Sequence, residues 1–126
     1  MSVDSRPPRA TYRLQLNEKF TFHHVEAIAD YLGKLGISHA YLSPILKARP
    51  GSTHGYDTVD HRLLNPELGT LDDFRRMAGA LRAAGVSIIL DIVPNHMGIG
   101  GDQNDLWLDV LEWGKESPYA DWFDIN

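Results

Sequence analysis

The sequence contains no cysteine among its 126 residues. Disulfide bonds and thiolate metal ligands are therefore excluded. It also lacks any uncharged apolar run near the roughly 18 residues that a membrane-spanning helix needs, and its opening residues MSVDSRPPRA contain no apolar region of a signal peptide. These absences predict a cytoplasmic protein that has no membrane partner.

Positive charge is also scarce, because 12 Lys and Arg residues stand against 17 Asp and Glu, which leaves a formal net charge of -5. No cluster of Lys or Arg could follow a phosphate backbone, so nucleic acid is not expected as a partner. A hydrophobic content of 43% and a charged content of 23% are typical of soluble globular proteins. The length predicts a single domain with a modest core.

The spacing of apolar residues predicts strands that alternate with helices. Thr70 and Asp73 resemble a capping box at the start of the second helix, and Gly36 and Gly85 follow the two predicted helices as C-terminal stops. A long irregular loop is expected from Pro44 to Thr70. The predicted strands are 10–16, 37–43 and 86–93, and the predicted helices are 22–35 and 71–84.

This order of elements predicts a parallel sheet that is built from right-handed crossovers. The third strand is almost continuously apolar, which is typical of a strand covered on both faces. The segment 98–126 differs, with a glycine-rich stretch, a possible short helix over 106–114 and an aromatic end. Its three tryptophans are assigned to packing, namely Trp107, Trp113 and Trp122.

Polar side chains gather where the second and third strands end. The stretch HGYDTVDH occupies residues 54–61, and the stretch DIVPNH places Asp91 in the third strand with Asn95 and His96 beyond it. Burial of such groups without partners would cost roughly 2 kcal/mol or more for each. Because parallel sheets place ligands at the carboxyl ends of their strands, these residues are candidates for a binding site.

Three interpretations of the first stretch stay open from its residues alone. In one, Tyr56 stacks on the apolar face of a sugar ring and Asp57 accepts hydrogen bonds from its hydroxyls. In another, His and Asp side chains bind a metal, although the spacing matches no known metal signature. In the third, Asp57 and Asp60 only stabilise turns and Tyr56 only packs.

The second stretch and the metal interpretation also leave alternatives. Asp91 and Asn95 could serve only the structure, by pairing with an arginine and by holding a turn, whereas His96 is expected to face a ligand. A metal-dependent hydrolase would use the set His54, Asp57, His61 and His96.

DIVPNH at the end of the third strand, together with GYD in the preceding loop, resembles two signature regions of the α-amylase family of (β/α)8 glycosidases and transglycosylases. The likeness extends from Ala10 onward through TYRLQL, YLSPILKARPGSTHGYDTVDH, NPELGT, LDIVPNHM and SPYADWFDIN. It implies the first three strands and two helices of a TIM barrel in residues 1–97. It also implies that residues 98–126 begin an inserted domain after the third strand.

The resemblance also implies roles for single residues. Tyr56 matches the tyrosine that stacks on the glucose before the cleaved bond, and Asp57 matches an aspartate that binds hydroxyls of that ring. His96 matches the histidine that binds the 6-hydroxyl. Asp91 matches a carboxylate that orders the catalytic arginine and nucleophile, and Asn95 matches a position that holds calcium in many amylases. No metal and no organic cofactor are expected here.

The implied activity belongs to a longer protein, because the nucleophile and the general acid of this family follow later strands. Within the family the chain is most similar to transglycosylases that convert the terminal α-1,4 bond at the reducing end of a maltooligosaccharide into an α,α-1,1 bond. A hydrolase that transfers to water and a non-catalytic carbohydrate-binding domain are the alternatives. The isolated segment is expected to be inactive and to self-associate.

Overall fold

The computed structural model describes residues 6–126, and its main sheet has three short parallel strands. They are β1 (Thr11–Leu14), β2 (His39–Leu42) and β5 (Ser87–Leu90), in the order β1-β2-β5. The register places Arg13 beside Tyr41 and Tyr41 beside Ile89. Helices connect these strands, so the predicted parallel βα units are confirmed.

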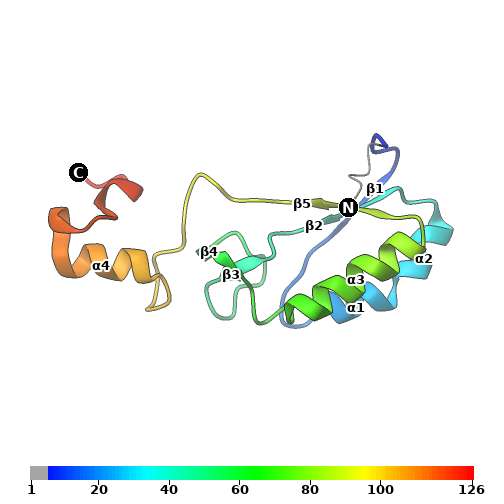
Figure 1. Cartoon of the computed structure of the whole chain (residues 1–126), viewed down its shortest axis with the longest axis horizontal. Coiled ribbons are helices and arrows are strands. Elements are labelled where there is room, and N and C mark those ends of the chain that lie inside the picture. Colours follow the sequence, from blue (N-terminus) through cyan, green and yellow to red (C-terminus); the bar gives the residue numbers. More distant parts are fainter. Residues whose placement is uncertain (1–5) are drawn as a thin grey trace.

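The helices α1 (Phe22–Ala27), α2 (Ala29–Leu35) and α3 (Leu71–Ala83) lie together on one side of the sheet (Figure 1). The prediction of a single helix over 22–35 was wrong, because Ile28 leaves helical geometry at φ -103° and ψ 5°. Its N–H bonds to the Val25 carbonyl three residues back, at 3.1 Å, which tightens and ends α1.

The hydrophobic core lies between the sheet and these helices. Alternate residues of the strands point into it, as period-2 patterning requires, and the apolar stripes of the helices meet them. Phe22, Val25, Leu32, Met77 and Leu81 are fully buried on the helix side. The strand side contributes Leu14, Leu16, Ala40 and Leu42.

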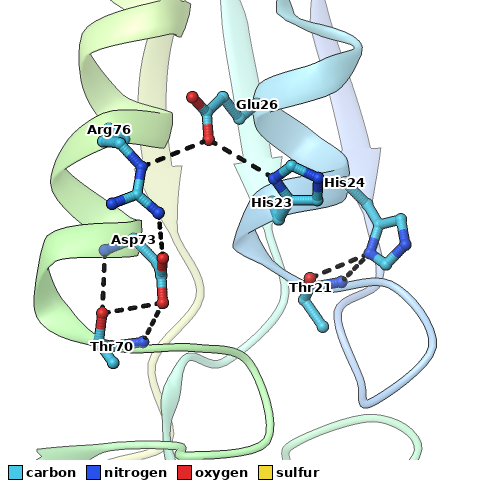
Figure 2. A network of polar contacts seen from close by, with 7 residues as sticks. All are labelled: Thr21, His23, His24, Glu26, Thr70, Asp73 and Arg76. Atoms are coloured by element: carbon cyan, nitrogen blue, oxygen red, sulfur yellow. Dashed lines mark hydrogen bonds and ion pairs between the residues drawn. The ribbon is translucent and has the colours of Figure 1, made fainter.

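Side-chain contacts at Thr21 and Thr70 start α1 and α3, and an ion pair connects these two helices (Figure 2). The Thr70 hydroxyl accepts from the Asp73 N–H at 3.1 Å, and the Thr70 N–H donates to the Asp73 carboxylate at 2.7 Å, which confirms the capping box. Arg76 bonds to Asp73 and reaches Glu26 of α1 at 3.9 Å. The Arg76–Glu26 pair joins α1 to α3, and both ion pairs are partly exposed and contribute little energy.

The predicted irregular loop instead contains an antiparallel pair, β3 (Leu46–Ala48) and β4 (Thr58–Leu64). Two register shifts interrupt the pairing, and five successive residues of β4 from Asp60 to its end are not buried. The short strand and the missing alternation explain why periodicity did not reveal the hairpin.

The third predicted strand is shorter and less covered than expected. β5 ends at Leu90, so Asp91 lies just beyond the strand, although its N–H still bonds to the Leu42 carbonyl at 3.0 Å. None of the four residues of β5 is buried, and Leu90 is 42% exposed. The expected cover on both faces is therefore not met within the described residues, where β5 is also an edge strand.

The C-terminal segment projects away from the sheet and its helices (Figure 1). It contains α4 (Asp105–Trp113) and the 3-10 helices η1 (Gly114–Glu116) and η2 (Ala120–Trp122). Trp107 packs against Phe123 at a ring distance of 5.0 Å, whereas Trp113 and Trp122 are 59% and 63% exposed. The assignment to packing therefore fits Trp107, and the exposed Trp122 still contacts the Tyr119 ring edge-on at 6.1 Å. None of the helices among residues 6–126 is long and apolar enough to cross a membrane.

Candidate functional site

The two polar stretches meet beyond the C-terminal ends of β2 and β5, as parallel topology predicts. β2 leads through Ser43 and Pro44 into the β3–β4 hairpin, whose connecting loop carries the GYD residues. Gly55 adopts φ +81°, and a Cβ there would lie 2.7 Å from the Pro44 carbonyl oxygen. Only glycine allows the loop to lie this close to the end of β2.

Tyr56 lies at the centre of a hydrogen-bonded group that draws on three segments. Its hydroxyl donates to Asp91 Oδ2 at 2.5 Å and accepts from Arg13 Nη2 at 2.8 Å. The Tyr41 hydroxyl donates to the same Asp91 oxygen at 3.1 Å. The Arg13 guanidinium lies 5.7 Å from the centroid of the Tyr41 ring. Sheet register places β1 and β2 so that the three side chains converge on Asp91.

The charges in this group support one another. The hydrogen bond with the Tyr56 hydroxyl raises the pKa of Arg13, so the guanidinium stays charged. Donation to Asp91 raises the pKa of Tyr41, which keeps its phenol protonated and able to donate. The Asp91 carboxylate therefore has two phenol donors and a nearby cation. The cost of placing this carboxylate at the end of β5 is therefore offset by side chains of this same chain.

Asp57 is half-buried and is held by its side chain and by its main chain. Its Oδ1 accepts from the Ser52 hydroxyl at 2.6 Å, and its carbonyl accepts from the Arg49 N–H at 3.0 Å. A Cβ on Gly98 would lie 2.7 Å from that carbonyl, so the segment after β5 passes directly over Asp57.

His96 is exposed, and it contacts the main chain of the first stretch rather than its side chains. Its Nε2 bonds to the Tyr56 carbonyl at 2.9 Å and therefore donates, which leaves Nδ1 as an acceptor in the neutral ring. The Gly98 N–H donates to the Thr58 carbonyl at 2.7 Å. The two stretches are thus joined through backbone groups.

The histidines of the metal interpretation do not converge. His54 Nδ1 accepts from the Tyr56 N–H at 3.0 Å, and His61 Nε2 bonds to the Val93 carbonyl at 2.9 Å. Within residues 6–126 no group of three or more His, Asp or Glu side chains is placed to hold a metal ion. Asn95 is exposed.

A groove near these residues separates the end of β5 from the C-terminal segment. Its lining includes His61, Asn95, His96, Trp107 and Trp122, and it does not include Tyr56 or Asp57. The structure therefore brings Tyr56, Asp57 and Asp91 together and places the side chains of Asn95 and His96 at the border of a second, more apolar surface.

Sequence reasoning missed three residues that shape the site: Arg13, Tyr41 and Ser52. In TYRLQL the polar residues alternate with the core residues, and this pattern alone assigns no function to Arg13. Parallel pairing of the first two strands would have placed Arg13 beside Tyr41. Ser52 gave no signal, because its contact with Asp57 depends on how the loop turns.

Comparison with known proteins decides the family. The model of the α-amylase catalytic domain matches residues 22–126. This chain belongs to the α-amylase family. A Mycobacterium tuberculosis (strain H37Rv) protein of this kind, provisionally named maltooligosyl trehalose synthase, is 48% identical over 126 residues, which cover 95% of this chain. The intracellular maltogenic amylase of Bacillus subtilis is 41% identical over 97 residues, which cover 77%.

Solved structures of the family agree with the fold. The structure of maltooligosyltrehalose synthase from Arthrobacter ramosus superimposes with a TM-score of 0.91 at 42% identity, over 94% of this chain. The three parallel strands and their helices therefore correspond to the N-terminal part of an α-amylase-family TIM barrel. The chain spans 16% of the length of each of these three relatives.

Proposed function

We propose that this chain is the N-terminal part of a maltooligosyltrehalose synthase. The longer enzyme would convert the terminal α-1,4 bond at the reducing end of a maltooligosaccharide into an α,α-1,1 bond by intramolecular transglucosylation. The observation that carries the proposal is the match to a maltooligosyl trehalose synthase at 48% identity over 95% of the chain. The match to the maltogenic amylase is weaker and shorter.

In this proposal Tyr56, Asp57 and His96 bind the glucose unit beside the cleaved bond. The Tyr56 ring supplies a stacking surface, and the convergence of its hydroxyl with Arg13 and Asp91 supports a fixed ring orientation. Asp57 supplies a carboxylate oxygen for sugar hydroxyls. His96 offers Nδ1, because its Nε2 is engaged by the Tyr56 carbonyl. Asp91 and Asn95 support the site without touching the reacting atoms.

The proposed reaction follows the retaining route of two carboxyl groups. One carboxylate attacks the anomeric carbon of the penultimate glucose unit, and the other group protonates O4 of the terminal glucose, so that the α-1,4 bond breaks and the rest of the chain stays on the first carboxylate. The anomeric hydroxyl of the released glucose then attacks the same carbon, gives its proton to the second group and displaces the first carboxylate. We place both groups in the longer protein. Residues 1–97 would form the start of the barrel and residues 98–126 the start of an inserted domain. No cofactor enters this scheme, and a cytoplasmic location stays a prediction.

Product analysis of the longer protein on maltopentaose tests the proposal. A synthase yields a product of unchanged length without a reducing end, whereas an amylase yields shorter reducing sugars. Free glucose or maltose as the main product would refute the proposal and support the hydrolase alternative. The match to the maltogenic amylase is the observation that favours this alternative. Binding of maltopentaose without any product would support the non-catalytic alternative.

A further inference from the structure

Ser52 is a buried hydroxyl, 8% exposed, in the loop before Tyr56. Its Oγ donates to Asp57 Oδ1 at 2.6 Å and accepts from the Gly55 N–H at 3.0 Å. Its own N–H donates to the Arg49 carbonyl at 3.0 Å, which closes the turn. The hydroxyl and the N–H of Ser52 therefore both form their hydrogen bonds within the loop.

The two contacts of the hydroxyl determine where its proton points. A serine hydroxyl has one proton and two lone pairs, and the Gly55 N–H occupies a lone pair. The proton is therefore available to Asp57, and the short O···O distance is typical of donation to a carboxylate. Gly55 is itself held against the Pro44 carbonyl at the end of β2. Ser52 thus connects Asp57 to a strand end.

Asp57 retains one free oxygen under this arrangement. Oδ1 is occupied by Ser52, and Oδ2 has no hydrogen-bond partner within the part of the chain that the structure describes. A carboxylate that is tethered through one oxygen loses its rotational freedom and presents the other oxygen in a defined direction.

We propose that Ser52 is a positioning residue for carbohydrate binding, which tethers Asp57 Oδ1 so that Oδ2 accepts hydrogen bonds from hydroxyls of one glucose unit. This inference rests on the proposed function, since it takes maltooligosaccharide as the ligand. It assigns Ser52 no contact with the sugar. The site should therefore prefer a sugar in which two adjacent hydroxyls both point toward Asp57 Oδ2.

A second serine in the same chain provides a matched control. Ser117 is also buried, 5% exposed, and its Oγ donates to Asp109 Oδ1 at 2.5 Å and accepts from the Tyr119 N–H at 3.1 Å. This serine lies between η1 and η2, outside the candidate site. Ser117→Ala removes the same kind of contact and reports what such a loss does to stability alone.

The experiment measures by calorimetry the affinity of the longer protein for maltopentaose. The variants compared are Ser52→Ala, Ser52→Thr, Ser117→Ala, Asp57→Ala and the double variant that combines Ser52→Ala with Asp57→Ala. We expect Ser52→Ala to weaken affinity about tenfold, Ser52→Thr to restore most of it, and Ser117→Ala to leave it unchanged. In the Asp57→Ala background the further change Ser52→Ala is expected to have no effect, because Ser52 acts through Asp57.

Two results would overturn the inference: unchanged affinity in Ser52→Ala, or an equal loss in the presence and absence of Asp57. Thermal unfolding of the same variants separates misfolding from loss of binding. Product analysis separates this inference from the proposed function. If maltopentaose binds in a Ser52-dependent way and only reducing sugars form, the synthase proposal fails and the role of Ser52 stands.

Discussion

Substitutions of Tyr56 separate the two contributions that its side chain makes to the candidate site. Tyr56→Ala removes the ring and the hydroxyl, whereas Tyr56→Phe removes only the hydroxyl that links Arg13 to Asp91. His61→Ala is the control, because His61 lies in the neighbouring strand β4, is exposed, and forms its hydrogen bond with the Val93 carbonyl rather than with Tyr56 or Asp91.

The expected effects follow from the contacts. Loss of stacking on a sugar face costs on the order of 1 to 3 kcal/mol of transition-state stabilisation, which is about fivefold to 150-fold in rate. Loss of the hydroxyl leaves the ring in place, and the Arg13 partner is solvent-exposed, so we expect about 1 kcal/mol, or roughly fivefold. His61→Ala is expected to stay within about twofold of the parent protein.

The assay is kcat/KM of the longer protein on maltopentaose, with thermal unfolding of each variant as the control for folding. The predicted order of activity is His61→Ala, then Tyr56→Phe, then Tyr56→Ala. Equal kinetics for Tyr56→Ala and His61→Ala would refute the stacking role of Tyr56. A Tyr56→Phe variant as weak as Tyr56→Ala would show that the hydroxyl contacts, rather than the ring, carry the effect.

Three further predictions concern stability and assembly. Phe22→Ala removes a fully buried ring that packs edge-on against Phe74, and it should lower the unfolding free energy by about 3 to 5 kcal/mol in urea titrations; a loss below about 1 kcal/mol would contradict the core assignment. The hydrogen bond from the Thr70 N–H lowers the pKa of the Asp73 carboxyl. The ionised Asp73 therefore stabilises the fold at pH values above 3.8, its pKa in the unfolded chain, and this stabilisation is lost as pH falls through the lowered pKa of the folded state. Urea titrations at acidic pH should show Asp73→Asn losing this dependence, with Asp72→Asn as the control. The isolated 126 residues should self-associate through the open edges of β1 and β5 and show no turnover of maltooligosaccharides, so a monomer in light scattering or genuine turnover would contradict the prediction.

Periodicity and end signals predicted the parts of the fold that depend on local sequence. The three parallel strands, the capping box at Thr70 and the stops near Gly36 and Gly85 all follow from patterns within a few residues. The break at Ile28 could not be seen in the same way, because the apolar stripe continues through it and neither glycine nor proline marks the position.

The candidate site was predictable to the extent that parallel topology brings strand ends together. Tyr56 and Asp91 meet as the two motifs implied, at 2.5 Å. Their remaining partners come from elements whose contact depends on register and loop path. Arg13 reaches Tyr56 across 43 positions of sequence, and no local pattern encodes that distance.

The carbonyl groups of residues 56 to 58 have a consequence for how such a site can change over time. Each accepts a hydrogen bond from one of two other segments: the Arg49 amide precedes the loop, and the His96 side chain and the Gly98 amide follow β5. Because two of the three donors are main-chain groups, the path of the loop is largely independent of which side chains it displays. Under the proposed function, the side chains at residues 56 and 57 can therefore change without moving the backbone that presents them. Gly98 is the exception, because any side chain there would clash with the carbonyl of residue 57 and move the loop that carries residues 56 and 57.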